Sequence, residues 1–178
     1  MTRHRTPNAK HPEAGITLIE LIIGMLIASV VLGATVLIFV NSWRTEASVT
    51  STTQATNTGQ VVASTIERAV RNADFVEVAA DQKTLQVQTS LGGSLTCQGF
   101  HLAGDALRMT IRSTPLGSPA LWPEWEDGLA AQGTAPFVSR TEHTVNYAFD
   151  MTTDASPVHF TGQASLRSVS TGETRTCW

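Results

Sequence analysis

The pattern of apolar and polar residues divides the chain into an apolar stretch, a mixed stretch and an alternating stretch. Residues 16–40 form an apolar run of 25 residues in which Glu20 is the single charged residue. As an α-helix this run would be about 38 Å long, which is enough to cross a bilayer with some tilt. The run therefore predicts a membrane-spanning helix with one carboxylate near its start.

The free-energy cost of placing Glu20 in a membrane can be compared with the gain from the apolar side chains around it. Sixteen Leu, Ile, Val or Phe side chains in the run favour insertion, together by about 5 to 10 kcal/mol. An ionised carboxylate at mid-membrane costs only about 2.5 to 3.5 kcal/mol. Insertion is thus favourable, but Glu20 opposes it, and a charge kept against its solvation energy suggests a function with a partner. The plainer interpretation is that Glu20 reaches the headgroups from near the helix end.

The charges on either side of the run predict its orientation. Three cations and one anion precede it within residues 1–15, whereas Arg44 and Glu46 follow it and cancel. The positive-inside rule then places the N-terminus in the cytoplasm and the rest of the chain outside. The run is longer than the 7–15 apolar residues of a secretory signal, although Leu-Gly-Ala at 32–34 could be read as a signal-peptidase site. An uncleaved plain anchor is a further alternative.

Beyond residue 40 the pattern predicts that the helix continues. There is no proline between residues 41 and 72, and Val62, Ile66, Ala69 and Ala73 form one apolar stripe at helical spacing. The serine- and threonine-rich residues 50–58 are weaker helix formers. We therefore expect a flexible or fraying middle around Gly59.

From Phe75 onward the period changes from helical to two. Leu85 and Val87, the residues 107–111 and the residues 145–151 alternate apolar with polar side chains, which is typical of half-buried strands. Turn residues at 81–82, 92–93 and 104–105 separate the first strands at the spacing of an antiparallel meander. A helix followed by strands predicts an α+β fold, with an antiparallel sheet packed on the C-terminal half of the long helix.

Residues 113–136 hold four prolines and are predicted to be irregular. Trp122 and Trp125 lie in this segment and could be exposed interface anchors, but the favoured interpretation is that both indoles pack back onto the sheet. Acidic residues at 124, 126 and 127 could suggest a calcium site. Without a recognisable loop pattern, a solvated acidic turn is the better interpretation.

Composition and motifs argue against several classes of function. The formal net charge is -3. Residues 1–15 carry three cations and one anion, so the rest of the chain has a net charge of -5, and nucleic-acid binding is disfavoured. No nucleophile elbow, zinc-protease helix, phosphate-binding loop or dinucleotide fingerprint is present. Two cysteines and scattered histidines do not give the spacing of a zinc site. We predict no enzymatic activity, catalytic residue, cofactor or metal.

The two cysteines are Cys97, in a predicted strand, and Cys177. Outside the membrane oxidation is permitted, so a disulfide between them is the favoured prediction. Such a bridge would close a loop of some 80 residues and stabilise the β-rich part of the chain by about 4 kcal/mol in the loop-entropy model. Free thiols are the alternative.

The residues at the start of the apolar run carry a resemblance. Residues 15–20 read Gly-Ile-Thr-Leu-Ile-Glu after a short charged leader. This resembles type IV prepilins and pseudopilins, whose mature N-terminus commonly reads Phe-Thr-Leu-Ile-Glu, and only Ile16 departs from that pattern. The resemblance covers about residues 10–40. It implies cleavage between Gly15 and Ile16 by a prepilin peptidase, followed by N-methylation of Ile16.

The resemblance also implies a partner for Glu20. In such filaments the glutamate faces the N-terminal amine of a neighbouring subunit, here the amine of Ile16. A carboxylate in a low-dielectric helix bundle is costly alone and partly compensated opposite an ammonium. Assembly is expected to use Ile16, Thr17 and Glu20, with Gly24 and Ala28 as small residues that let helices approach closely.

The resemblance implies a structural subunit rather than an enzyme. The expected parts are a leader (1–15), a transmembrane and filament-core helix (16–40), a helix continuation that packs on the head (41–73) and a β-rich head (74–178). The apolar run has no proline and the β-rich head is relatively large, which favours a minor pilin or pseudopilin. The rival from another class is a membrane-tethered exported binding domain or enzyme that never polymerises.

Partners and location follow from the same resemblance. The expected partners are a prepilin peptidase, other pilin or pseudopilin subunits, an inner-membrane assembly platform and the lipid bilayer. The subunit is expected to wait in the cytoplasmic (inner) membrane as a single-pass protein, with its N-terminus inside. It would then enter an extracellular or periplasmic filament of a type IV pilus or of type II secretion.

Overall fold

The structure is a computed structural model that describes residues 17–90, 93–167 and 176–178. The predicted leader and the residues Gly15 and Ile16 lie outside the described residues, as does Gly92 of one predicted turn. The chain separates into two units, Met1–Thr45 and Glu46–Trp178. Each unit is described by itself.

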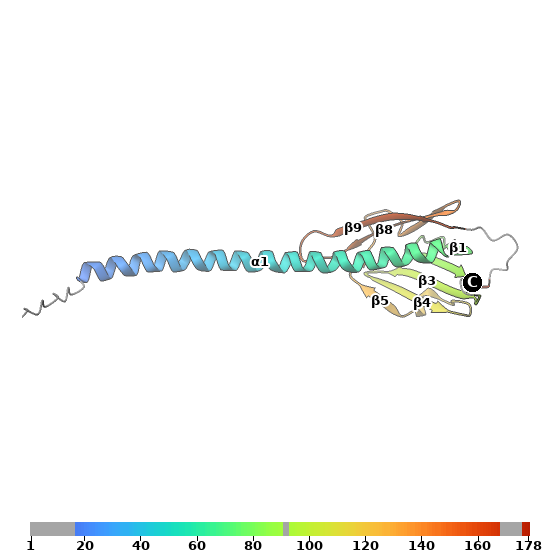
Figure 1. Cartoon of the computed structure of the whole chain (residues 1–178), viewed down its shortest axis with the longest axis horizontal. Coiled ribbons are helices and arrows are strands. Elements are labelled where there is room, and N and C mark those ends of the chain that lie inside the picture. The colour runs from blue at the N-terminus through green and yellow to red at the C-terminus, as the bar shows by residue number, and fades with distance from the viewer. Residues whose placement is uncertain (1–16, 91–92, 168–175) are drawn as a thin grey trace, which may run out of the picture. The chain divides into compact units, whose positions relative to one another are not determined.

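In the described part of the chain, the long helix α1 (Leu18–Arg71) comes first and the strands follow it (Figure 1). The strands are β1 (Phe75–Val78), β2 (Thr84–Thr89), β3 (Thr96–Ala103), β4 (Ala106–Arg112), β5 (Glu124–Asp127), β6 (Leu129–Ala130), β7 (Val138–Thr141), β8 (Thr144–Met151) and β9 (Val158–Ser165). A single 3₁₀ turn, η1 (Pro119–Leu121), lies between β4 and β5. The predicted α+β architecture is confirmed.

The predicted weak point of the helix at Gly59 is wrong. α1 continues through Gly59, which is buried. A β-carbon added at this position would overlap the ring of Phe160 in β9, so the ring lies directly on the helix backbone. Packing against the head therefore outweighs the low helix propensity of glycine and of the neighbouring threonines.

The first sheet is the predicted meander, with the strand order β1-β2-β3-β4-β5. Leu85 pairs with Phe100, and Phe100 pairs with Met109. Directly opposed residues share a face, and all three contribute to the main core. The predicted turns at 81–82 and 104–105 are present, where Gln82 and Gly104 adopt φ values of 55° and 68°.

The second sheet is built around β8. This strand pairs with β9 along its whole length, and with β7 and β6 along successive parts. Val145, Tyr147, Phe149 and Met151 are buried and alternate with less buried residues, as the period of two predicts. The alternation could not show that β8 belongs to a separate sheet from β2 and β4.

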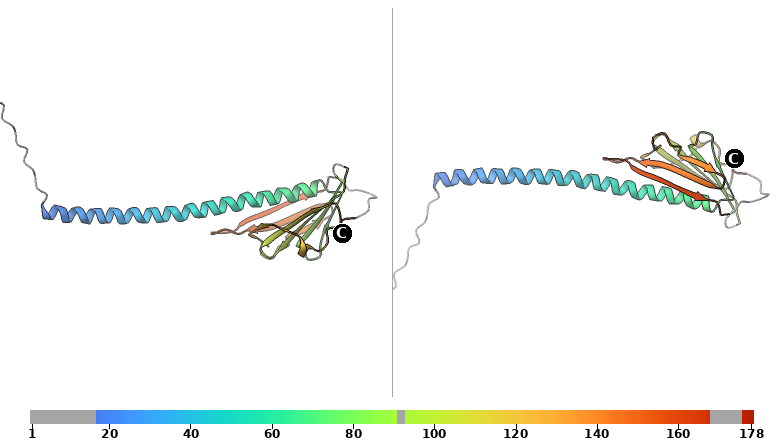
Figure 2. Two further views of the ribbon diagram at one scale, coloured as in Figure 1. Left: turned by 90° about the horizontal axis from the view of Figure 1, so that it is seen from below. Right: turned by 90° about the horizontal axis from the view of Figure 1, so that it is seen from above.

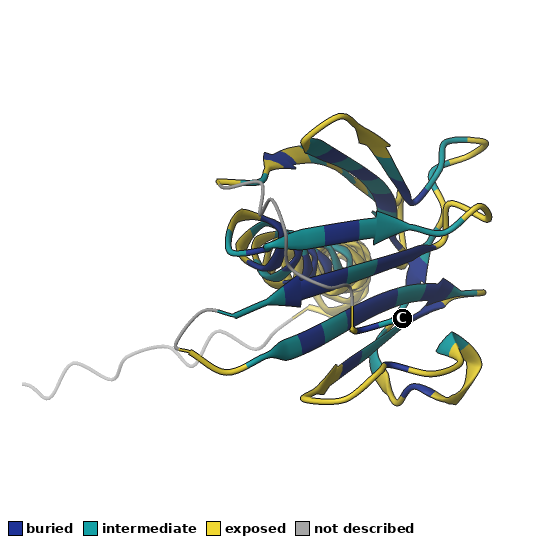
Figure 3. Cartoon of the chain, turned by 90° about the vertical axis from the view of Figure 1, so that its right-hand side faces the viewer, coloured by how far each residue is buried: buried dark blue, intermediate teal, exposed yellow. Residues whose placement is uncertain are grey.

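Both sheets share one core with the C-terminal part of α1. Val62 and Ile66 are fully buried, and the predicted stripe from Val62 to Ala73 is confirmed. Phe100 of the first sheet and Phe149 of the second belong to the same cluster of buried residues. Figure 1 shows the two sheets flanking this part of the helix, and Figure 2 shows both on the same side of it. In Figure 3 the buried positions follow the strands and the exposed ones gather in the turns.

A hydrogen bond ties the helix to the second sheet within this core. The Tyr147 hydroxyl donates to Glu67 Oε1 at 2.8 Å, and Glu67 Oε2 pairs with Arg71 at 2.9 Å. Burial, reinforced by this bond to a carboxylate, raises the pKa of Tyr147 above its usual value. The phenol therefore remains a donor throughout the physiological pH range.

The segment 113–136, predicted to be irregular, folds in part onto the outer face of the first sheet. Trp122 is 1% exposed and its Nε1 donates to the Leu116 carbonyl at 3.0 Å. Its ring covers Gly99 of β3, since a β-carbon at Gly99 would overlap it. Trp125 is partly buried against the main core. The interpretation that both indoles pack back onto the sheet is confirmed.

Two further expectations for this region are wrong. Glu124, Glu126 and Asp127 do not form a solvated turn, because they belong to the edge strand β5. β5 pairs only with the first part of β4, Ala106–Arg108. Beyond these residues the Met109 backbone N–H still donates to the Pro123 carbonyl at 3.1 Å. Ile111, which the alternation predicted to be half-buried, is 52% exposed.

The contact between Gly99 and Trp122 gives a stability prediction. We expect Gly99→Ala to lower the free energy of unfolding by about 1 to 3 kcal/mol, the usual cost of overpacking, because Trp122 cannot move without losing its bond to Leu116. Urea unfolding of the full chain in mild detergent, followed by tryptophan fluorescence, measures the effect. Gly24→Ala is the matched control, since a β-carbon at Gly24 meets nothing within 4 Å. Equal stability of the two variants would show that the Trp122 ring does not hold this position.

Candidate functional site

The candidate site lies on the N-terminal part of α1, in the first unit. Large apolar side chains are exposed along it, from 78% at Leu18 to 43% at Val40. In the described part of the chain, α1 is a helix long and apolar enough to cross a membrane, and no described residue covers its most apolar stretch. Such a surface needs lipid or other helices as its surroundings.

The start of this helix is organised by Thr17 and Glu20. The Glu20 backbone N–H donates to Thr17 Oγ1 at 3.3 Å, which makes Thr17 the N-cap of α1. The pattern Thr-x-x-Glu is the sequence signal of a capping box. We assigned Thr17 to assembly from the resemblance alone, and this local role was missed.

The Glu20 side chain is exposed. Within the residues that the structure describes, its carboxylate makes no hydrogen bond or ion pair. The Ile16 amine, its predicted partner in a neighbouring subunit, lies outside the described residues. The structure therefore shows a carboxylate on an apolar helix surface, with its partner still to be identified.

Glu20, Gly24 and Ala28 are spaced by four residues and share one face of α1. Together with Leu21 and Met25 they line a shallow depression on the helix surface. A β-carbon at Gly24 would meet no atom of the chain within 4 Å. The depression can thus admit a second helix at close distance, beside a negative charge.

Two of the three hydroxyl side chains in residues 16–40, those of Ser29 and Thr35, donate to carbonyls of the helix itself. Ser29 Oγ donates to the Leu26 carbonyl at 2.8 Å, and Thr35 Oγ1 donates to the Val31 carbonyl at 2.8 Å. A polar group without a partner is costly in hydrocarbon. These bonds let the segment enter a bilayer with Glu20 as its single charged group.

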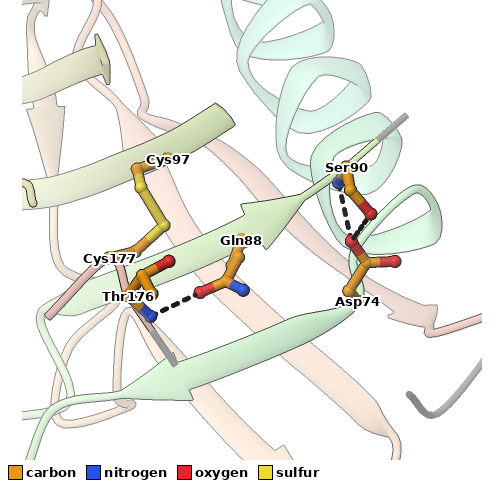
Figure 4. Close-up of a disulfide and its surroundings, with 6 residues drawn as sticks. All are labelled: Asp74, Gln88, Ser90, Cys97, Thr176 and Cys177. Atoms are coloured by element: carbon orange, nitrogen blue, oxygen red, sulfur yellow. Dashed lines mark hydrogen bonds between the residues drawn. A yellow bond between two sulfur atoms is a disulfide. The ribbon is translucent and has the colours of Figure 1, made fainter. Parts of the chain in front are cut away.

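The predicted cysteine pair lies in the second unit, in the β-rich head. Cys97 and Cys177 form a disulfide with both residues fully buried (Figure 4). Leu116 and Trp122 pack against the bridge in a second buried cluster. The bridge is thus a structural feature of the head.

The described residues contain no group of three or more His, Cys, Asp or Glu side chains placed to hold a metal ion. His159 Nδ1 and Asp150 Oδ1 are 2.6 Å apart, but they form a pair without a third such group in the described part of the chain, and the histidine side chain is 64% exposed. The apolar helix surface around Glu20 is therefore the best candidate site.

Fold and site together define a class of protein: an α+β head that follows a helix with an uncovered apolar surface. Residues 10–36 match the family model for the prokaryotic N-terminal methylation motif, the signature of type IV pilins and pseudopilins. The match includes Gly15, Ile16 and Glu20. No curated protein and no solved structure matches the chain. The motif is that of structural subunits, and together with the apolar helix it fits membrane anchoring of a pilin.

Proposed function

We propose that this chain is a prepilin that is cleaved after Gly15, N-methylated at Ile16 and assembled through its N-terminal helix into a filament. The motif match over residues 10–36 and the uncovered apolar surface of α1 support this proposal. In the membrane the chain would be a single-pass protein with its N-terminus in the cytoplasm. Its partners would be a prepilin peptidase, an assembly platform and other pilin or pseudopilin subunits.

The observation that carries the proposal is the position of Glu20. It is the fifth residue after the predicted cleavage site and the single charge in residues 16–40. No described residue neutralises it. Cleavage after Gly15 would create an ammonium at Ile16, and the ammonium of a neighbouring subunit could then pair with Glu20 when helices bundle.

Gly24 supports close helix packing in the same filament. Glycine within a helix costs about 1 kcal/mol relative to alanine, and at Gly24 no contact within the described chain offsets that cost. A small residue that faces outward is useful where a second helix approaches. The depression at Glu20, Gly24 and Ala28 would be one such contact.

We further propose that the subunit is a minor pilin or pseudopilin. The apolar run contains no proline, and the head carries two sheets joined by a common core with α1. These features favour a subunit with an elaborate head over the main building block of a pilus. The apparatus could serve adhesion, DNA uptake, motility or protein secretion.

The test of processing is the mass and N-terminal sequence of the mature chain. After coexpression with a prepilin peptidase we expect a chain that starts at Ile16 and is about 14 Da heavier than the unmodified product, because of one methyl group. The control is expression without the peptidase, which should leave Met1–Gly15 attached. A chain that keeps its leader beside an active peptidase would favour the rival, a tethered exported domain that does not polymerise.

A further inference from the structure

An aromatic pair marks the end of the apolar stretch of α1. Phe39 and Trp43 are one helical turn apart, with ring centroids 5.6 Å apart in an edge-to-face arrangement. Both are largely exposed, 62% for Phe39 and 65% for Trp43. The first residue of α1 that is buried is Ala55, twelve positions further along. Within the first unit, therefore, most of the Trp43 ring stays exposed.

The sequence around this pair changes character abruptly. Between Glu20 and Trp43 there is no charged residue, whereas Arg44 and Glu46 follow the indole directly. A tryptophan side chain has an apolar body and one N–H donor, and it is enriched where hydrocarbon meets headgroups. Trp43 thus lies between the end of the apolar run at Val40 and the first charged residue after it, Arg44.

The spacing between Glu20 and Trp43 fits the thickness of a bilayer. Trp43 lies 23 positions after Glu20 within α1, which gives an axial distance of about 35 Å. The hydrocarbon core is about 30 Å thick, so with a moderate tilt the two residues can reach opposite headgroup layers at once. Neither residue then has to enter the middle of the bilayer.

We propose that Trp43, supported by Phe39, is an interfacial anchor in the outer headgroup layer of the membrane, where it holds Glu20 at the level of the inner headgroups before assembly. The partner is the lipid–water interface, which accepts the indole ring and its N–H donor. This inference rests on the membrane-inserted state of the proposed function. It assigns a role in membrane anchoring to Trp43, which lies outside both the methylation motif at residues 10–36 and the head.

With this anchor, Glu20 would be in one environment before assembly and in another after it. In the waiting subunit, the carboxylate lies among hydrated headgroups and is not strongly destabilised. When the subunit leaves the membrane, the same carboxylate moves into a helix bundle and needs a cation. Trp43 therefore defines the resting depth from which assembly starts.

The test uses the full, uncleaved chain in phosphatidylcholine and phosphatidylglycerol vesicles, without peptidase or assembly machinery. Lipids brominated near the headgroup, in mid-chain or near the chain end quench tryptophan by depth. The signal of Trp43 is the difference between the wild type and Trp43→Phe, since the other tryptophans, at 122, 125 and 178, lie in the head. We expect shallow bromines to quench this signal at least about twofold more than deep ones.

The exchange variant Phe39→Trp/Trp43→Phe is the matched control, with the same aromatic pair and the indole four residues, about 6 Å, nearer the membrane centre. Its tryptophan should be quenched by deeper bromines than Trp43. Absence of lipid quenching of Trp43, or strongest quenching by the deepest bromines, would overturn the anchor. Either result leaves cleavage after Gly15 untouched, and a failure of cleavage would leave the depth of Trp43 unchanged, so the two proposals fail separately.

Discussion

Replacement of both Cys97 and Cys177 by alanine is expected to lower the free energy of unfolding of the head by about 4 kcal/mol. The disulfide joins residues 80 positions apart, so its loss frees a long loop in the unfolded chain. Alanine is the suitable replacement because both cysteines are fully buried, and a serine hydroxyl at either site would need a buried partner.

The bridge is also coupled to contacts that position the end of the chain. The Thr176 backbone N–H donates to the buried Gln88 side chain at 3.0 Å (Figure 4). The Leu116 backbone N–H donates to the Cys177 carbonyl at 2.9 Å. Both bonds depend on residues 176–177 staying on the outer face of the first sheet. Without the disulfide we expect these bonds to open before the main core unfolds.

Urea unfolding of the full chain in detergent measures the loss, with tryptophan fluorescence as the probe. The control is reduction: dithiothreitol should bring the wild type down to the stability of the double alanine variant and leave that variant unchanged. A double variant within about 1 kcal/mol of the oxidised wild type would show that the bridge adds little to the fold.

The parts of this fold that sequence could predict are those set by local periodicity. The stripe from Val62 to Ala73 defines one helix face, and the alternation in β8 defines one strand face. Each pattern extends over more than two periods and concerns neighbours along one element. The helix, the strands and the position where helical periodicity gives way to strand periodicity could therefore be predicted without knowledge of any tertiary contact.

The parts that sequence missed are set by contacts between distant residues. Gly59 looked like a weak point because its support, Phe160, lies a hundred residues later. Packing of Trp122 onto the sheet was predicted, but Gly99 gave no sign that it is the residue that the ring covers. The acidic residues of β5 have low strand propensity, yet pairing with β4 makes them a strand.

The candidate site could be proposed from sequence, because its chemistry needs no fold beyond a helix, and the roles of its residues in cleavage and assembly stay predictions. Glu20 stands out through the apolar residues around it, and Gly24 and Ala28 follow at four-residue spacing. Trp43 was missed because it lies just outside the apolar run that drew attention. Its edge-to-face contact with Phe39 and its exposure became visible only in the structure.

Substitution of Glu20 by alanine is expected to leave the subunit in the membrane but to reduce its incorporation into filaments at least about tenfold. Removal of one partner from a buried charge pair commonly costs about 3 to 5 kcal/mol, because the other charge is left unpaired. Here the unpaired group would be the amine of Ile16 in the adjacent subunit. Insertion itself should not be impaired, since the alanine variant carries no charge in residues 16–40.

Unimpaired insertion together with reduced incorporation would distinguish a loss of charge pairing from a general loss of the subunit from the membrane. Fractionation with immunodetection measures the variant in the membrane and in sheared filaments, and the ratio of the two reports assembly. Glu20→Asp keeps the charge on a shorter side chain and should retain part of the incorporation, whereas Glu20→Gln keeps the shape without the charge and should behave like alanine. Because Thr17 caps the helix through the Glu20 backbone N–H and not through its side chain, none of the three variants removes that bond. Full incorporation of Glu20→Gln would therefore exclude charge pairing and leave helix packing around Gly24 and Ala28 as the basis of assembly.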